Sequence, residues 1–295
     1  MRKSYRCAVG LTALPSLLLV GCSIFPTTRK LPVPKAPAVT QTAEPEDLVA
    51  QLNKRWDGVD ALTATVEIRA TELKNNEGVE KDFPSCRGFI VIRKPKMLRV
   101  VGTYFGVKIF DMASDGKNFT LVIPTKSIAF EGSNDAKGTS PNPMYNLRPD
   151  FFFDAMIVRG LAPEDFYTRM GDTETLEDAA KKHLSLMPEY VLSITRHNTG
   201  SRNDTPVRVI TFHRDDLLPY QQDLYDGSGN LETEVVYAKY ADFGSSRYPS
   251  VVTIKRPQEG IQIALTVERV IENPKLTDEQ FQIKMPDEVK VQKLE

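Results

Sequence analysis

The 295-residue chain is poor in the residues from which catalytic and metal-binding motifs are built. It has three cysteines and three histidines, and the histidines show no metal-ligand spacing such as HExxH. A GxSxG nucleophile elbow, a P-loop and a GxGxxG fingerprint are also missing. We therefore expect no enzyme, no metal site and no cofactor. The alternative is a hydrolase of lipid or glycan that uses His197 or His213, although both fall at predicted strand ends, where a solvated imidazole is ordinary.

The chain also lacks an excess of charge of either sign. Lys and Arg number 38, Asp and Glu number 39, and the formal net charge is −1. Nucleic-acid binding requires a concentrated basic face, so no nucleic-acid partner is expected. Nothing in the sequence indicates more than a monomer.

The start of the chain, by contrast, is typical of a bacterial secretory signal peptide. Basic residues precede an apolar run at positions 8–20, and the small Gly21 then precedes Cys22. The sequence Leu-Val-Gly-Cys at 19–22 resembles the lipobox of bacterial lipoproteins, which implies removal of residues 1–21 and acylation of Cys22. The apolar run is too short for a permanent membrane span, which needs about 20 residues. The alternatives are an uncleaved anchor, which Pro15 disfavours, and cleavage at another position.

The segment 22–45 has the composition of a tether between this lipid anchor and a folded domain. Prolines at positions 26, 32, 34, 37 and 45 favour extended polyproline geometry, and few apolar residues are present to anchor the segment. Ser23 stands where proteobacterial sorting rules read Asp as a signal for retention in the inner membrane. By resemblance to those rules, we expect a protein anchored by lipid in the outer membrane and facing the periplasm.

The cysteines then exclude an internal disulfide. Cys7 leaves with the signal peptide and Cys22 carries lipid, so Cys86 alone remains in the mature chain. Because Cys86 lies where a strand is predicted to begin, we expect a buried, unreactive thiol.

The remainder, 46–295, is predicted to be mainly β with a few helices. A helix is expected at 45–57, because Pro45 suits its first turn and Gly58 suits its end. Apolar residues in this helix recur at four-residue spacing, which predicts one buried stripe. From residue 62 onward the period changes to two, which is typical of half-buried antiparallel strands. Tight turns separate about eleven or twelve such strands, so the sequence predicts a meander.

A stretch at 132–188 interrupts the meander and is interpreted as a helical insertion. It opens with polar and turn-forming residues, and helices are expected at 149–158 and, with weaker periodicity, at 176–186. No internal repeat or second core is visible. The range 46–295 is therefore expected to form a single domain.

Apolar residues occur at two unusual places. Tyr104, Phe105 and Gly106 lie between two predicted strands, where a turn normally has polar residues. Phe105 is then either exposed at the tip or folded back under the hairpin. Residues 151–153 are three consecutive phenylalanines, about 100° apart on the predicted helix, and cannot all face one sheet in a narrow stripe. That helix either is buried on two sides or leaves apolar surface exposed.

The order of these elements resembles the LolA/LolB-like family of periplasmic lipoprotein carriers and outer-membrane lipoprotein receptors, over about residues 46–286. The segment 98–112 resembles the receptor's strand, protruding loop and strand, and 115–117, 157–161 and 276–281 resemble further parts of the family. The resemblance implies an unclosed, strongly curved antiparallel β half-barrel, with helices forming a lid over an apolar cavity. The tether and the insertion are both longer than in the family.

The resemblance also implies binding of acyl chains of lipoproteins or other lipids, with a periplasmic carrier protein as a partner. The apolar residue before a glycine at the receptor's loop tip falls on Phe105, which implies that Tyr104, Phe105 and Gly106 enter the membrane. The alternative is a periplasmic sensor or envelope scaffold that binds a protein or lipid signal with the same fold. The residues expected to line the acyl-chain cavity, on an assumed strand face that a one-residue register error would invert, are Val66, Ile68, Val91, Val101, Ile109, Leu121, Phe152 and Met156.

Overall fold

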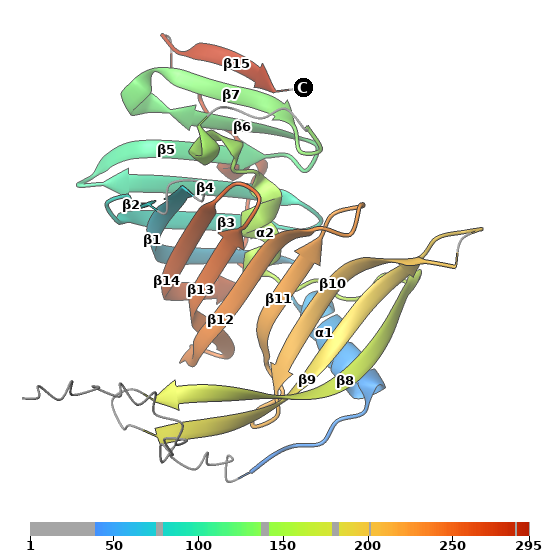
Figure 1. Ribbon diagram of the computed structural model, residues 1–295. Coiled ribbons are helices and arrows are strands. Elements are labelled where there is room, and N and C mark those ends of the chain that lie inside the picture. Colours follow the sequence, from blue (N-terminus) through green and yellow to red (C-terminus); the bar gives the residue numbers. More distant parts are fainter. Residues whose placement is uncertain are drawn as a thin grey trace, which may run out of the picture.

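The computed structural model describes residues 39–74, 79–136, 142–178, 183–200, 202–286 and 288–294. In this part of the chain, fifteen strands form one sheet, accompanied by helices α1 (Pro45–Gly58) and α2 (Pro149–Met156) (Figure 1). The strands are β1 (Ala61–Lys74), β2 (Val79–Asp82), β3 (Cys86–Arg93), β4 (Met97–Tyr104), β5 (Val107–Ser114), β6 (Asn118–Ile123), β7 (Ile128–Ser133), β8 (Asp165–Asp178), β9 (His183–His197), β10 (Asp204–His213), β11 (Pro219–Tyr225), β12 (Leu231–Phe243), β13 (Ser246–Arg256), β14 (Ile261–Glu272) and β15 (Lys290–Leu294).

Strand β1 lies in the middle of the sheet and joins two antiparallel meanders. The strand order is β15-β7-β6-β5-β4-β3-β1-β14-β13-β12-β11-β10-β9-β8, and β2 pairs with β1 beside this path. On one side Ala64 of β1 pairs with Ile90 of β3, and on the other side it pairs with Val270 of β14. The sheet ends in two edges, β15 and β8, so the predictions of a mainly β fold and an unclosed sheet are confirmed.

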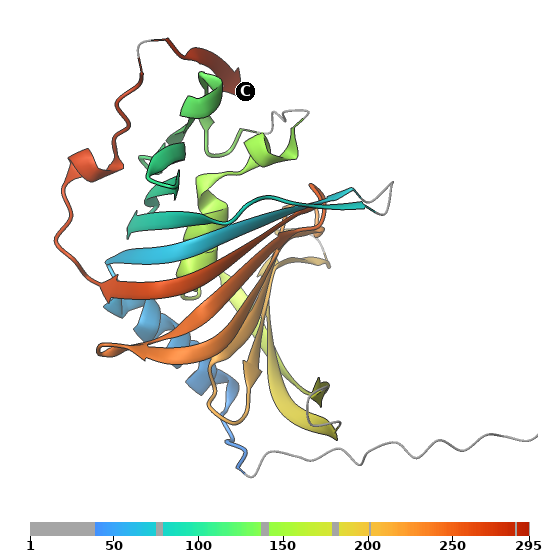
Figure 2. The same cartoon turned by 90° about the vertical axis from the view of Figure 1, so that its left-hand side faces the viewer.

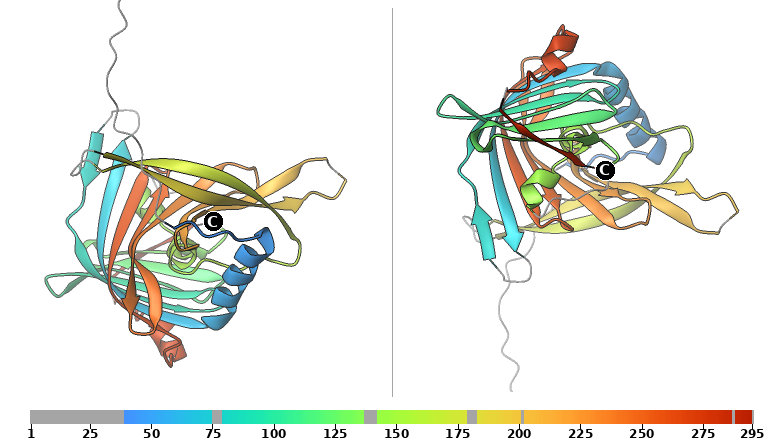
Figure 3. Two further views of the ribbon diagram at one scale, coloured as in Figure 1. Left: turned by 90° about the horizontal axis from the view of Figure 1, so that it is seen from below. Right: turned by 90° about the horizontal axis from the view of Figure 1, so that it is seen from above.

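The sheet curves around α2. Figure 3 shows this helix end-on within the curve, and Figure 2 shows the curvature from the side. Helix α2 contacts β4 and β5 of the first meander and β13 of the second. The helix therefore fills the concave side and bridges the two halves of the sheet.

Helix α1 occurs where its sequence signals predicted it. Pro45 occupies the first turn, and the side chains of Glu44 and Asp47 form a capping box at the N-terminus. Leu48 and Leu52 are buried, as the apolar stripe predicts. Among the described residues, neither helix is long and apolar enough to cross a membrane.

The helix predicted at 176–186 is wrong. Residues 179–182 lie outside the described part of the chain. The residues on both sides of them belong to the hairpin of β8 and β9, in which Leu176 pairs with Ser185. Helix propensity is a weak prior that tertiary pairing often overrides, and β8 pairs with β9 along its whole length. In the described residues of 132–188, helix therefore occurs only in α2 and in a short 3-10 turn at Pro143–Asn146.

The core lies on the face of the sheet that α2 covers. Successive residues of a strand point to opposite faces, and in β3 this separates Ile90, which is fully buried, from Phe89, which is 46% exposed. Cys86 is also buried, as expected. Burial, assisted by Glu67, raises the pKa of Cys86 to about 11, which makes the reactive thiolate scarce at neutral pH.

These opposite faces predict losses of stability of different size for neighbouring substitutions. Ile90→Ala should lower the free energy of unfolding by about 2–5 kcal/mol, because it removes apolar contacts and leaves a cavity. Phe89→Ala is the matched control on the same strand and should cost clearly less. Urea unfolding followed by circular dichroism measures both, and equal losses would contradict the assignment of the faces.

Candidate functional site

The most exposed large apolar side chain of the described residues lies at the tip of the β4–β5 hairpin. Phe105 is 88% exposed, and its ring centroid lies 4.6 Å from that of Tyr104. The next residue of the hairpin after Gly106, Val107, is 59% exposed. The alternative in which Phe105 folds back under the hairpin is therefore wrong, and the tip presents a small apolar surface to solvent.

The backbone of this tip is a tight two-residue turn. Phe105 and Gly106 have φ values of 47° and 80°, and a hairpin turn with positive φ at both central residues matches the twist of the two strands it joins. Glycine adopts such a φ without strain, whereas a bulky residue rarely does. The turn holds the Phe105 ring away from the sheet, where no core contact covers it.

A buried ion cluster secures the base of the same hairpin. Asp111 is 1% exposed and accepts hydrogen bonds from Arg99 Nε at 2.9 Å and Arg99 Nη2 at 2.8 Å. Lys108 Nζ donates to the same carboxylate at 2.6 Å. Burial alone would raise the pKa of Asp111, but the hydrogen bonds from Arg99 and Lys108 outweigh it, and the pKa lies below its usual value.

The residues expected to line the acyl-chain cavity do not all share one face. One core cluster contains Val66, Ile68, Leu121, Phe152 and Met156, and Ile109 packs against it. Val91 and Val101 are placed incorrectly by the prediction, because they alternate with buried Ile90, Ile92 and Val100 and so lie on the opposite face.

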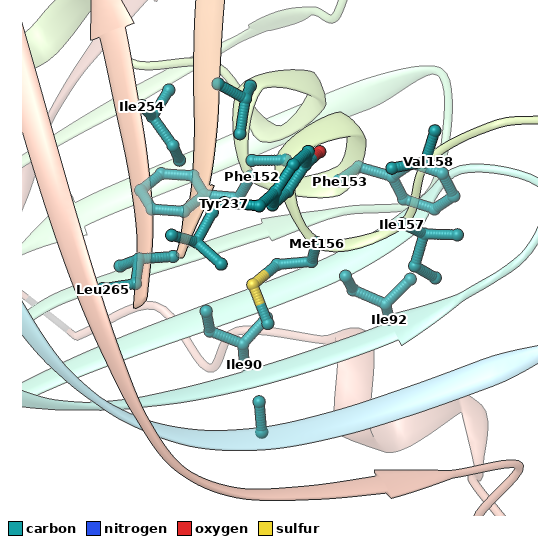
Figure 4. Packing of buried hydrophobic residues seen from close by; sticks show 14 of the residues in the cluster. Ile90, Ile92, Phe152, Phe153, Met156, Ile157, Val158, Tyr237, Ile254 and Leu265 are labelled. Atoms are coloured by element: carbon teal, nitrogen blue, oxygen red, sulfur yellow. The ribbon is translucent and has the colours of Figure 1, made fainter. Parts of the chain in front are cut away.

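The concave interior is filled by side chains. Phe152, Phe153 and Met156 of α2 lie among apolar residues of the sheet, including Ile90, Ile92, Tyr237, Ile254 and Leu265 (Figure 4). Phe151 points elsewhere and lies under the guanidinium of Arg256, 3.6 Å from ring centroid to Cζ. The three phenylalanines are thus divided between two sides of the helix: Phe152 and Phe153 are buried, whereas Phe151 is only partly buried.

Polar contacts hold α2 and the residues after it in this position. The Tyr248 hydroxyl of β13 donates to the Met156 carbonyl, and Gln222 Nε2 of β11 donates to the Asp154 carbonyl at 3.1 Å. Arg208 of β10 donates to the Gly160 carbonyl at 2.7 Å. These bonds connect the helix and its C-terminal extension to the second meander.

A cavity of about 1150 Å³ lies beside α2, and its lining is polar. None of the eight predicted cavity residues borders it, whereas Arg148, Arg208 and Arg256, all at least nine-tenths buried, do. Burial raises the pKa of Asp154, which also borders it, to about 6, although Arg159 opposes the shift. The sequence had no signal for this cavity, since its residues come from α2, six strands and several loops.

The two histidines considered for catalysis lie at opposite ends of the β9–β10 pair. His197 Nδ1 lies 2.9 Å from Asp204 Oδ1 at one end, in an exposed position. His213 Nε2 lies 3.3 Å from Glu189 Oε1 at the other end, in a buried position. Cys22 and residues 23–38 of the predicted tether lie outside the described residues.

Known proteins resemble this chain in fold rather than in sequence. No protein-family model and no curated protein matches the sequence. The structure is similar to a LolA superfamily protein from Nitrosomonas europaea, with 14% identity, a TM-score of 0.48, and coverage of 83% of this chain and 99% of that one. It is also similar to a DUF1329 family protein from Desulfovibrio piger, with 15% identity, a TM-score of 0.47 and coverage of 81% and 95%. At such identities and TM-scores the function has to be inferred from the chain's own residues.

The ion cluster at the hairpin base predicts a pH-dependent loss of stability. Asp111→Asn should lower the free energy of unfolding at pH 7 by about 1–3 kcal/mol, because the buried side chain loses its charge-assisted hydrogen bonds from Arg99 and Lys108. Since the folded pKa of Asp111 is lowered, the wild-type advantage is complete above the unfolded pKa of about 4 and declines as the pH falls through the folded pKa.

Urea unfolding at pH 7 and pH 3 measures this difference. Asp60→Asn is the control, because the Asp60 carboxylate is largely exposed and lies 3.6 Å from Lys94 Nζ. It should change stability by less than about 1 kcal/mol. An Asp111→Asn effect that stays constant down to pH 3 would contradict the assigned role of this carboxylate.

Proposed function

We propose that this chain is a lipid-anchored envelope protein that binds acyl chains and receives or inserts lipoproteins or lipids at the outer membrane. The observation that carries the proposal is the exposed Phe105 on a tight two-residue turn, beside Tyr104. Monomeric proteins rarely expose large contiguous apolar patches, and such patches mark membrane or protein contact sites. An aromatic pair on a turn can enter the apolar part of a bilayer without exposing strand edges to it.

The proposed place for the acyl chains is the space that the apolar side of α2 occupies. Phe152, Phe153 and Met156 of this short helix cover the concave core, and an acyl chain offers the same kind of surface. Burial of apolar area contributes about 25 cal/mol per Å², so a few hundred Å² would supply several kcal/mol. That energy suffices for binding and still permits onward transfer without a nucleotide.

The contacts that hold α2 are compatible with its displacement. Hydrogen bonds such as those from Tyr248 and Gln222 contribute only about 1 kcal/mol each on balance, because water replaces them when they break. An incoming acyl chain would therefore have to offset the loss of a few such hydrogen bonds. The apolar contacts that α2 gives up would be replaced by contacts of the acyl chain itself. In this proposal α2 serves as the lid that the family resemblance implies.

Acylation of Cys22 and the tether at 22–45 complete the proposal. A double acyl anchor holds a protein stably on a membrane, whereas one chain is marginal. The tether would keep the domain, and with it the Phe105 tip, within reach of the outer membrane from the periplasmic side.

The first test is transfer of an acylated lipoprotein from a purified periplasmic carrier to the chain from residue 23 onward. We expect the acylated lipoprotein to co-elute with the chain on size exclusion and its unacylated form to remain free, because the acyl groups supply the binding energy. If neither form moves, acyl binding is refuted. Stable capture of the unacylated protein would instead favour the sensor or scaffold alternative.

The second test separates membrane delivery from acyl binding. Phe105→Glu should leave acyl uptake unchanged and reduce insertion of the lipoprotein into vesicles at least tenfold, because a carboxylate opposes entry into the bilayer. Phe166→Glu on β8 is the matched control, since Phe166 is 60% exposed but lies far along the sheet from the hairpin. Normal delivery by Phe105→Glu would refute the role of the tip.

A further inference from the structure

Three strands at one end of the second meander bring together a histidine and two glutamates. Glu189 of β9 is paired with His213 of β10, and Glu174 lies on the neighbouring strand β8. The ligand atoms of these three side chains all lie within 4.8 Å of one another. Tyr190 and Phe212, which are paired one residue further along, belong to the core cluster, so alternation places the three on the opposite face.

The charge at this place is not neutralised by cations. The charged groups close to Glu189 are Glu174 and Asp172, and those close to His213 are Asp215, Asp216 and Glu174. All of the neighbours are acidic. A local excess of carboxylates attracts cations.

The two nearest arginines along the chain are engaged elsewhere. Arg214 donates to the Gln41 carbonyl at 3.0 Å, and Arg169 donates to the Ala43 carbonyl. Both guanidinium groups also lie over the ring of Tyr190. The two arginines therefore contact the N-terminal segment and the core-facing side of the sheet, not the carboxylates of Glu174 and Glu189.

Glu189 supplies the independent observation that points to a ligand. The residue is 8% exposed, and among the described residues its carboxylate has one potential hydrogen-bond donor, His213 Nε2 at 3.3 Å, whereas its neighbours Glu174 and Asp172 are acidic. A buried charge without a paired cation or a metal is costly. The imidazole itself is held in place by Tyr220, whose ring is stacked on it at 3.5 Å with an interplanar angle of 6°.

From this geometry we propose that Glu174, Glu189 and His213 bind a divalent transition-metal ion, with Zn²⁺ as the best-fitting species. Imidazole nitrogen and carboxylate oxygen are both ligands of Zn²⁺, at about 2.0–2.2 Å, and a histidine disfavours the harder Ca²⁺ and Mg²⁺. Glu174 is exposed, so it gives the ion a route of entry, and its side chain can move to close the coordination sphere. The site does not depend on the proposed lipid function.

The test is Zn²⁺ binding to the full chain, purified in detergent and freed of metal with a chelator that is then removed. Competition with a chromophoric zinc indicator should show one ion per chain. His213→Phe keeps a flat ring for the Tyr220 stack but removes the ligand nitrogen, and Glu189→Gln keeps the shape but removes the charge. Each should weaken binding at least tenfold.

His197→Ala is the matched control, because His197 lies at the other end of the same strand pair beside Asp204. It should leave Zn²⁺ affinity unchanged. Zn²⁺ should also raise the midpoint of thermal unfolding of the wild type but not that of His213→Phe, since an ion that binds only the folded chain stabilises it. Equal affinity in wild type and His213→Phe, or no binding by the folded wild type, would overturn the proposal.

Discussion

The fold depends on the pairing of β1 with two strands that are distant from each other in sequence. β3 follows β1 closely, whereas β14 comes almost at the end of the sheet-forming chain, and both pair with β1 along most of its length. Without the β14 pairing, the two meanders would be separate sheets with two more open edges. Closure of so long a loop has a substantial entropic cost, which the continuous core beneath β1, with Val66 fully buried, has to offset.

Helix α2 uses the concavity that this arrangement creates. It touches β4 and β5 on one side of β1 and β13 on the other, so its removal would expose apolar surface on both meanders at once. A helix of eight residues is too short to be stable by itself. Its position must therefore come from tertiary contacts, which makes it a suitable element for exchange with another apolar occupant of the same space.

The sequence predicted best what local chemistry decides. The apolar turn at Phe105 and the start of α1 at Pro45 both occur as expected, because turn and cap signals act over a few residues. The faces of Val91 and Val101 were wrong because residues 89–92 form an unbroken apolar run and Val101 directly follows Val100, so period two is not visible at either place. Residues 176–186 were misassigned because helix-favouring residues there are overruled by pairing between β8 and β9. The Glu174–Glu189–His213 cluster could not be predicted, since only strand register brings its residues together, and the polar cavity could not be predicted, since it forms only when α2, strands and loops pack together.

The two meanders of the sheet carry different surface features. The exposed aromatic tip belongs to the first meander, whereas the carboxylate-rich cluster around His213 and most strands that line the polar cavity belong to the second. A membrane surface rich in anionic groups would repel the acidic end and accept the apolar tip, so charge and hydrophobicity favour the same orientation of the domain. In the order of the sheet, β1 lies between the strands of the hairpin and the second meander, and α2 contacts strands on both sides of it, so a change on the concave side acts on both halves.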